Sequence, residues 1–293
     1  MAGSPSHKFG QDLGNLLEYV VLYLILKPKL EQFTSEKKYF LDWQCERPVR
    51  PGKKKVTWQD QYGNSHDLDF VIEAGGTPEK IGTPVAFIEA AWRRYTKHSK
   101  NKVQEIQGAL LPIVELHKLS APFYGAVLAG DFSKPSLDQL RNNNFSVLYI
   151  PYKDVVDAFM AVNFDIAFDE ETPDKKFAAA SVKLAALSAP DLDKIRNALI
   201  AASETEIDKF MSSLKKTLER IVSQVVLIPM FGTEVVSTTV SDALKNLAKI
   251  DINRTSGRLQ KIEVIVDYSN GDVIRASFGT VENATGFLSG LQR

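Results

Sequence analysis

Cysteine and histidine are scarce in this chain of 293 residues, and the chain has no net charge. A single cysteine, Cys45, excludes an intramolecular disulfide and a cysteine-based zinc cluster, and it is typical of a reducing compartment. Four histidines leave little material for a histidine-rich zinc site. Basic and acidic residues number 36 each, so the net charge is zero and any site for a polyanion must be local.

Signals for export and membrane insertion are absent as well. Residues 1–10 lack the charged start, apolar stretch and cleavage site of a secretory signal. The apolar run from Leu16 to Leu26 is interrupted by Glu18 and is shorter than the roughly 20 residues that span a bilayer. The chain also has no Gly-x-x-x-x-Gly-Lys loop to cradle a phosphate. We therefore expect a cytoplasmic protein without a membrane partner.

The first half of the chain alternates between helical and strand patterns. Apolar residues recur at helical spacing over residues 13–30, and a hairpin is predicted over residues 55–73 around a Tyr-Gly-Asn turn. Further strands are predicted at 84–88, 122–129 and 145–151, with helices at 92–118 and 138–144. This order predicts an α/β fold with a mixed central sheet flanked by helices over residues 1–168.

The character of the sequence changes near residue 169. Helical patterns rich in Ala, Lys and Glu follow at 174–187, 191–201 and 204–225. The chain ends with two alternating stretches around Ser269-Asn270-Gly271, which is a strong turn signal for a β-hairpin. We predict a second domain over residues 169–293, helical with a C-terminal hairpin, that serves dimerisation or DNA contact.

Two of the predicted strands carry an acid near their ends. Asp69 lies in the stretch His66 to Glu73, and Glu89 follows an apolar strand about twenty residues later. Carboxylates on neighbouring strands can bind a hard cation and leave positions open for water and a phosphate. Such a cation lowers the pKa of bound water and offsets the charge that develops on the phosphate. The pair therefore predicts metal-assisted hydrolysis of phosphodiesters.

The placement of these acids resembles the PD-(D/E)xK nuclease superfamily, which includes restriction endonucleases, Holliday-junction resolvases and repair nucleases. The family pairs an Asp on one strand with Glu-x-Lys on the next, and the resemblance covers residues 15–152. It implies a restriction-endonuclease-like domain in which Asp69, Glu89 and the Ala90 carbonyl hold Mg²⁺, with Mn²⁺ as a substitute. It also implies that Glu18, in the first helix, assists the metal site.

The chain departs from this motif at Ala91, where the family has the lysine that orients the attacking water. The next stretch, Trp92 to Lys102, contains six basic residues and two aromatic ones. We expect Lys97 or Arg94 to replace the missing lysine. Basic residues directly after a catalytic strand also fit contact with DNA phosphates. The expected phosphate contacts are Arg93, Arg94, Lys97, Lys100 and Lys102.

Structural interpretations of the same residues stay open. Asp67 and Asp69 could be solvent-facing acids of a hairpin, Glu18 could belong to a buried ion pair, and the basic run could be a solvated helix face. Glu89 is harder to explain in this way, because an acid closing an apolar strand is costly unless it is paired or bound to a metal.

These expectations combine into a Mg²⁺-dependent DNA endonuclease of the restriction type. Such an enzyme is expected to act as a homodimer, because a two-fold protein matches a palindromic site. A DNA methyltransferase is then an expected partner. Two alternatives remain: a nuclease fold that binds DNA or regulates without cutting, which Ala91 favours, and a nuclease for junctions, flaps or RNA.

Overall fold

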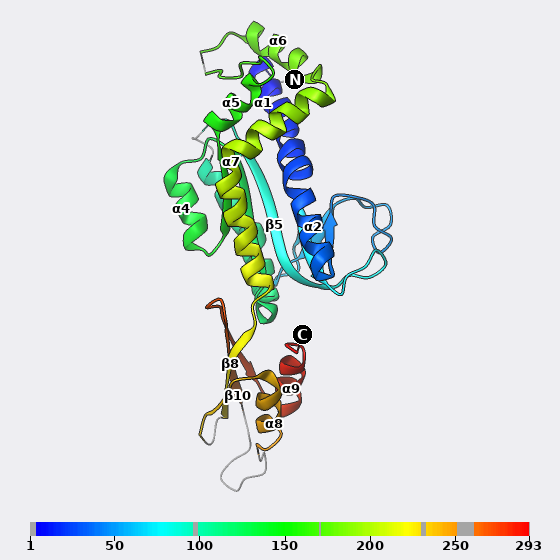
Figure 1. The fold of residues 1–293 in the computed structure, drawn as a ribbon, viewed down its shortest axis with the longest axis vertical. Helices are drawn as coiled ribbons and strands as arrows, with labels where there is room; N and C mark the ends of the chain where they lie inside the picture. Colours follow the sequence, from blue (N-terminus) through cyan, green and yellow to red (C-terminus); the bar gives the residue numbers. More distant parts are fainter. Residues whose placement is uncertain (1–3, 96–98, 170, 230–232, 251–260, 293) are drawn as a thin grey trace. The chain divides into compact units, whose positions relative to one another are not determined.

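The computed structural model describes residues 4–95, 99–169, 171–229, 233–250 and 261–292 (Figure 1). The chain forms two compact units. The first comprises Met1–Leu116 and Phe123–Leu214, and the second comprises His117–Pro122 and Lys215–Arg293. Among the described residues, no helix combines the length and the apolar character needed to cross a membrane.

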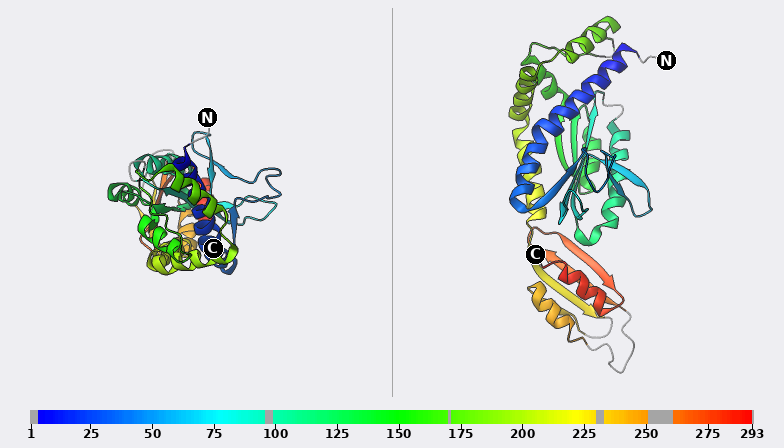
Figure 2. Two further views of the ribbon diagram at one scale, coloured as in Figure 1. Left: turned by 90° about the horizontal axis from the view of Figure 1, so that it is seen from above. Right: turned by 90° about the vertical axis from the view of Figure 1, so that its right-hand side faces the viewer.

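A five-stranded sheet forms the centre of the first unit (Figures 1 and 2). Its strands, in spatial order, are β1 (Tyr39–Trp43), β4 (Phe70–Ala74), β5 (Thr83–Arg93), β6 (Phe123–Gly130) and β7 (Ser146–Pro151). The pairs β1–β4 and β4–β5 are antiparallel, while β5–β6 and β6–β7 are parallel. A separate arm pairs β2 (Val56–Gln59) with β3 (Ser65–Leu68). The predicted mixed sheet is confirmed.

One face of this sheet is covered by α3 (Ser99–Leu116) and α4 (Lys134–Asn142). These helices are the crossovers that parallel strands require. Their apolar side chains form one buried cluster with the strands. The cluster includes Phe87 of β5, Val103 and Ile106 of α3, Leu128 of β6 and Leu140 of α4.

A long helix and α7 (Ala189–Leu218) lie against the other face (Figure 2). The long helix consists of α1 (Pro5–Glu18), a π-helical segment η1 (Tyr19–Leu26) and α2 (Lys27–Lys37). Phe210 of α7 packs edge-on against Phe123 of β6, with ring centroids 5.4 Å apart. The remaining helices of the unit are α5 (Tyr152–Met160) and α6 (Asp174–Ala185).

The compact units do not divide at residue 168, where the sequence prediction placed the domain boundary. Phe177 of α6 contacts Phe9 of α1, with ring centroids 5.8 Å apart. Ser213 of α7 hydrogen-bonds to Ser146 of β7 at 2.6 Å. Because these helices bury their apolar faces on the first unit, the second unit begins only at Lys215.

Three predicted helices also differ from the structure. Trp92 and Arg93 were expected to begin a helix but extend β5, because β6 continues beside them as far as the pair Arg93 and Gly130. The helix α3 begins at Ser99. The predicted helices at 191–201 and 204–225 are the single helix α7, and the chain then enters a strand at Val222.

The second unit is a four-stranded antiparallel sheet in the order β11-β10-β8-β9, with two helices. Its elements are β8 (Val222–Pro229), β9 (Val235–Ser237), α8 (Val240–Leu247), β10 (Ile262–Tyr268), β11 (Val273–Phe278) and α9 (Val281–Ser289), preceded along the chain by the short helix η3 (Lys118–Ser120). Strands and helices share one apolar core. The predicted C-terminal hairpin is confirmed: Gly271 adopts φ 91° in the turn between β10 and β11.

Candidate active site

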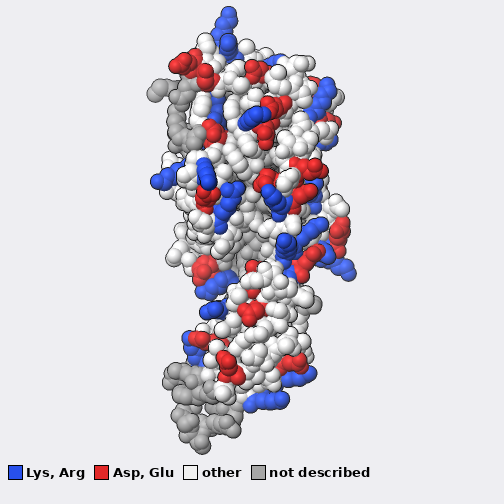
Figure 3. Space-filling model, turned by 60° about the vertical axis from the view of Figure 1, so that its left-hand side comes forward, with Lys and Arg blue, Asp and Glu red and all other residues white. Residues whose placement is uncertain are grey.

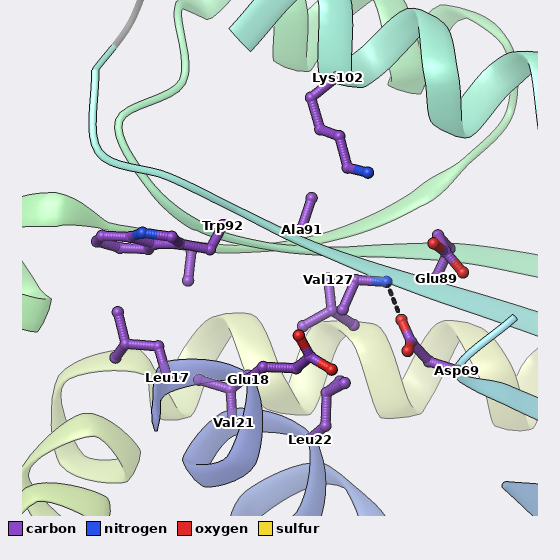
Figure 4. A pocket seen from close by; sticks show the side chains of 12 residues that line it. Leu17, Glu18, Val21, Leu22, Asp69, Glu89, Ala91, Trp92, Lys102 and Val127 are labelled. Carbon is purple, nitrogen blue, oxygen red and sulfur yellow. Dashed lines mark hydrogen bonds between the residues drawn. The ribbon is translucent and has the colours of Figure 1, made fainter. Parts of the chain in front are cut away.

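Asp69 is the single residue between the arm strand β3 and the central strand β4. Pairing of β4 with β5 begins at Phe70 and Ile88, so no β4 carbonyl meets the N–H of Ala90. The Ala90 N–H instead donates to Oδ2 of Asp69 at 2.7 Å (Figure 4). The Asp69 carboxylate is thereby fixed against the strand that carries Glu89.

Glu89 lies on β5 beyond the end of its pairing with β4. It is half-buried, and its Oε2 atom is buried without a hydrogen-bond partner in the part of the chain that the structure describes. An unsatisfied buried carboxylate oxygen is costly, because the water that solvated it has not been replaced. Glu89 therefore has a coordination position to offer to a ligand.

Two further charged side chains line the same pocket of about 210 Å³ (Figure 4). Glu18 enters from the last position of α1, and Lys102 reaches from α3 toward the strand. Asp69 and Glu89 complete the polar lining. Residues that lie far apart in the sequence thus converge on one site from both sides of the sheet.

The electrostatic balance of the site favours protons or cations. Burial raises the pKa of Asp69, and the nearby Glu18 raises it further, while the Ala90 N–H and Lys102 act in the opposite direction. Burial also raises the pKa of Glu89, and the adjacent charge of Asp69 adds to the effect. Among the described residues, Lys102 is the cation that acts on both carboxylates, and it does not offset their burial.

This donor set fits a hard divalent cation. Mg²⁺ is commonly held by one or two carboxylates while water completes its octahedral shell. Asp69 and Glu89 supply two carboxylates, one of which has an unpartnered oxygen. Among the described residues there is no closed group of three or more His, Cys, Asp or Glu side chains that could hold a metal ion. The site therefore matches a two-carboxylate centre more closely than a protein cage.

The expected basic replacements for the family lysine are not both at this pocket. Arg94 does not line it: its guanidinium lies between the rings of Phe9, Tyr95 and Phe177, at 5.5, 4.6 and 4.6 Å from their centroids. The structure does not bring Arg94 to this pocket, because Trp92 and Arg93 continue the strand and Arg94 then turns toward α1 and α6. Lys97 lies outside the described residues.

Among the described residues, Lys102 is the basic side chain that lines this pocket. Ala91 is buried on the face of β5 that packs against α3, and Figure 4 shows the Lys102 side chain descending from α3 above it. The sequence predicts Lys102 only as a phosphate contact, because the predicted strand ends at residue 88 and the predicted helix begins at residue 92. In the structure β5 continues to Arg93, and Lys102 lies in the first turn of α3.

The other expected phosphate contacts are dispersed. Arg93 lies 3.9 Å from Glu105, which also pairs with Lys102 at 3.0 Å. Lys100 is exposed on the first turn of α3. Figure 3 shows acidic and basic side chains intermixed over the face that it displays.

Asp67 follows the structural interpretation instead. It is exposed on the arm strand β3, where it accepts hydrogen bonds from Lys55 at 2.6 Å and Thr57 at 2.7 Å. These contacts lower the pKa of Asp67, with the Lys55 ammonium as the largest cause. Asp67 and Asp69, two residues apart, therefore have opposite environments.

Comparisons with known proteins do not assign this chain to a family. No family model and no curated protein matches it. A solved structure of a protein of unknown function, AF1548, is similar with a TM-score of 0.28 and 11% identity, over 61% of this chain and 95% of that chain. A likeness of this degree carries no argument about fold or function.

Proposed function

We propose that the first unit is a Mg²⁺-dependent nuclease that hydrolyses DNA phosphodiester bonds, as the resemblance to the PD-(D/E)xK superfamily implies. The observation that carries this proposal is the convergence of Asp69, Glu89, Glu18 and Lys102 on one pocket in which a carboxylate oxygen of Glu89 is unpartnered. The same acids on a surface would be solvated, and in a closed core they would be paired.

Each side chain has a role that follows from its position. Asp69, held by the Ala90 N–H, and Glu89 would hold the cation, together with the Ala90 carbonyl that the resemblance implies. When bound, Mg²⁺ acidifies a water molecule and offsets charge on the phosphate. Glu18, exposed at the pocket rim, would hydrogen-bond water at the metal site.

The main reason to expect an inactive fold is the missing lysine at Ala91, and Lys102 can supply that charge. Without a lysine at Ala91, no group of the motif itself would stabilise the negative charge on the phosphate. Lys102 brings an ammonium to the same pocket from the adjacent helix. This placement supports a catalytic nuclease over a fold that binds DNA without cutting it.

The direct test is cleavage of supercoiled plasmid and of a flapped duplex in Mg²⁺ or Mn²⁺ by wild type, Asp69→Asn and Glu89→Gln. We expect wild type to cut and both variants to lose activity by a factor of at least about 10². Asp67→Asn is the matched control, because Asp67 is exposed and does not line the pocket. Activity that survives in both site variants, or failure of wild type to cut either substrate with either ion, would reject the proposal.

The products of this reaction decide the class of nuclease. Discrete fragments from duplex DNA, together with a homodimer in light scattering, are expected of a restriction enzyme with a partner methyltransferase. Cleavage limited to frayed ends, flaps or junctions is expected of a structure-specific nuclease. The groove described below favours the second class.

A further inference from the structure

The acid pocket opens into a larger groove of about 580 Å³ beside α1. The pocket and the groove share lining residues, among them Glu18, Trp92 and Lys102. A chain that places one phosphate at Asp69 and Glu89 therefore has a continuous path into the groove. Its volume is that of a pocket that encloses a small molecule, which suits one or two nucleotides rather than a duplex.

One wall of the groove is a polar stripe on α1. His7, Gln11 and Asn15 are spaced four residues apart, so they lie on one side of the helix, and all three line the groove. From His7 to Glu18 the helix rises by about 16 Å. Beside Gly10 the groove is open, since a Cβ there would meet no atom within 4 Å. The stripe offers hydrogen-bonding groups along an open path.

Aromatic rings and cations also line the groove. Trp92 and Tyr95 line the groove, and Arg93, Arg94 and Lys102 lie among them. Base stacking on aromatic side chains within a cationic groove is the recurrent way in which proteins hold a single strand without reading its sequence. A base-paired duplex hides its base faces, so it cannot use such rings in this way.

Arg94 supplies an independent sign of an anionic ligand. Its side chain is only 7% exposed, and Nε and Nη2 have no hydrogen-bond partner among the described residues. Its guanidinium is surrounded by aromatic rings, and no described carboxylate forms an ion pair with it. Ring contacts alone compensate a buried cation incompletely. A phosphate in the groove would supply the missing counter-charge.

We infer that this groove binds a single strand of nucleic acid, with bases against Trp92 and Tyr95 and backbone phosphate near Arg93 and Arg94. The inference rests on the proposed nuclease function and specifies its substrate: DNA with an unpaired segment next to the cleaved bond. The strand leaves the metal site along α1 toward Ser6 and His7.

The test fills the groove without touching the charged residues. Gly10→Leu projects a side chain into open space and replaces a poor helix former by a good one, so the fold should be retained. Gly108→Leu is the matched control, because Gly108 also lies in a helix with no atom near its Cβ and does not line the groove. Thermal unfolding by circular dichroism verifies both variants.

Binding is measured by fluorescence anisotropy with labelled thymidine oligonucleotides of roughly 12 nucleotides and a blunt duplex of equal length, in Ca²⁺. We expect wild type and Gly108→Leu to prefer the single strand, and Gly10→Leu to bind it about tenfold more weakly, the loss of one base stack. Equal affinity of Gly10→Leu and wild type for the single strand overturns the inference. So does tighter binding of the duplex by wild type.

Cleavage separates this inference from the nuclease proposal. If wild type binds the single strand through the groove but cuts no DNA in Mg²⁺ or Mn²⁺, the nuclease proposal fails and the groove assignment stands. If Gly10→Leu cuts duplex and flapped DNA as well as wild type does, the nuclease proposal stands and the groove assignment fails.

Discussion

Glu73 and Glu89 are acids on adjacent strands of one sheet, yet their surroundings are opposite. Glu73 of β4 is 0% exposed, and Arg47 donates to both of its oxygens, at 2.7 and 3.0 Å. The N–H of Gly82 adds a third hydrogen bond, at 2.7 Å. Glu89 of β5 retains a buried oxygen with no partner among the described residues.

The cations beside these two acids, Arg47 and Lys102, also differ in how fully the protein satisfies their donors. Arg47 also donates to Asp42 at 2.7 Å and to the carbonyls of Thr77 and Lys80, so its own donors are satisfied by the protein. Lys102 instead shares its charge with the exposed Glu105 and reaches into a pocket. Charges that are fully paired within the protein stabilise its loops. Charges that keep unpaired atoms are available to bind a ligand.

The largest effect on stability is expected for Arg47→Met. Removing this guanidinium leaves Glu73 buried without its cation and leaves Asp42 with Arg50 alone, which should lower the free energy of unfolding by about 3–5 kcal/mol. Urea denaturation followed by circular dichroism measures this loss. Lys102→Met should lower it by less than about 1 kcal/mol, because Lys102 is partly exposed. Equal losses in the two variants would remove the distinction between the sites.

The next effect concerns catalysis, for which Lys102 should matter more than Arg47. Lys102→Ala should slow DNA cleavage by about 10²–10³-fold, because the ammonium that stabilises the phosphate is lost. Adding Ala91→Lys to Lys102→Ala should restore part of the rate, since position 91 lies on the same face of β5 as Glu89. Lys100→Ala, on the same helix but outside the pocket, is the control. A double variant no faster than Lys102→Ala would contradict the assignment.

The pH dependence of stability should distinguish the incomplete site without any cleavage assay. Burial raises the pKa of Glu89 above its unfolded value near 4.5, so the folded protein binds this proton more tightly than the unfolded chain. That stabilisation is complete below the unfolded pKa and is lost as pH rises through the folded pKa.

Without divalent ions, the stability of wild type relative to Glu89→Gln should therefore fall by about 1–2 kcal/mol between pH 5 and pH 8. Urea titrations at each pH give the difference, and Mg²⁺ should reduce it. Asp67→Asn should leave the trend intact, because Asp67 is exposed and its pKa is lowered. A constant difference between wild type and Glu89→Gln would show that Glu89 is not held in an unfavourable charged state.

The smallest effect is expected at the exposed pair of Lys55 and Asp67, whose side chains are 65% and 44% exposed. Lys55→Met should change the free energy of unfolding by about 0.2–1 kcal/mol and leave cleavage unchanged. The same denaturation and plasmid assays apply. A larger loss of cleavage would mean that the arm before Asp69 takes part in positioning that residue.

Local patterns predicted the strand that carries Glu89, because an apolar run closed by an acid is visible in a short window of sequence. They predicted one continuous strand through Asp69, whereas this residue separates β3 from β4. They did not predict Lys102 at the pocket. The basic run from Trp92 to Lys102 has no internal boundary, and the end of β5 is set by its parallel partner β6. The extent of the first unit was hidden for the same reason, since α6 and α7 are placed by contacts with distant residues such as Phe9 and Ser146.

The π-helical turns of η1 separate two parts of one long helix: α2, and α1, which carries Glu18 and the polar stripe. Val20, Leu22 and Leu26 are buried within η1, while Glu18 immediately before it faces the pocket. A π-helix carries more residues per turn than an α-helix. It therefore rotates the side chains of α1 about the helix axis relative to those of α2. Deleting one residue there would turn α1 by about 100° relative to α2. The segment thus sets the angle at which both Glu18 and the polar stripe of α1 are presented, independently of how α2 is packed.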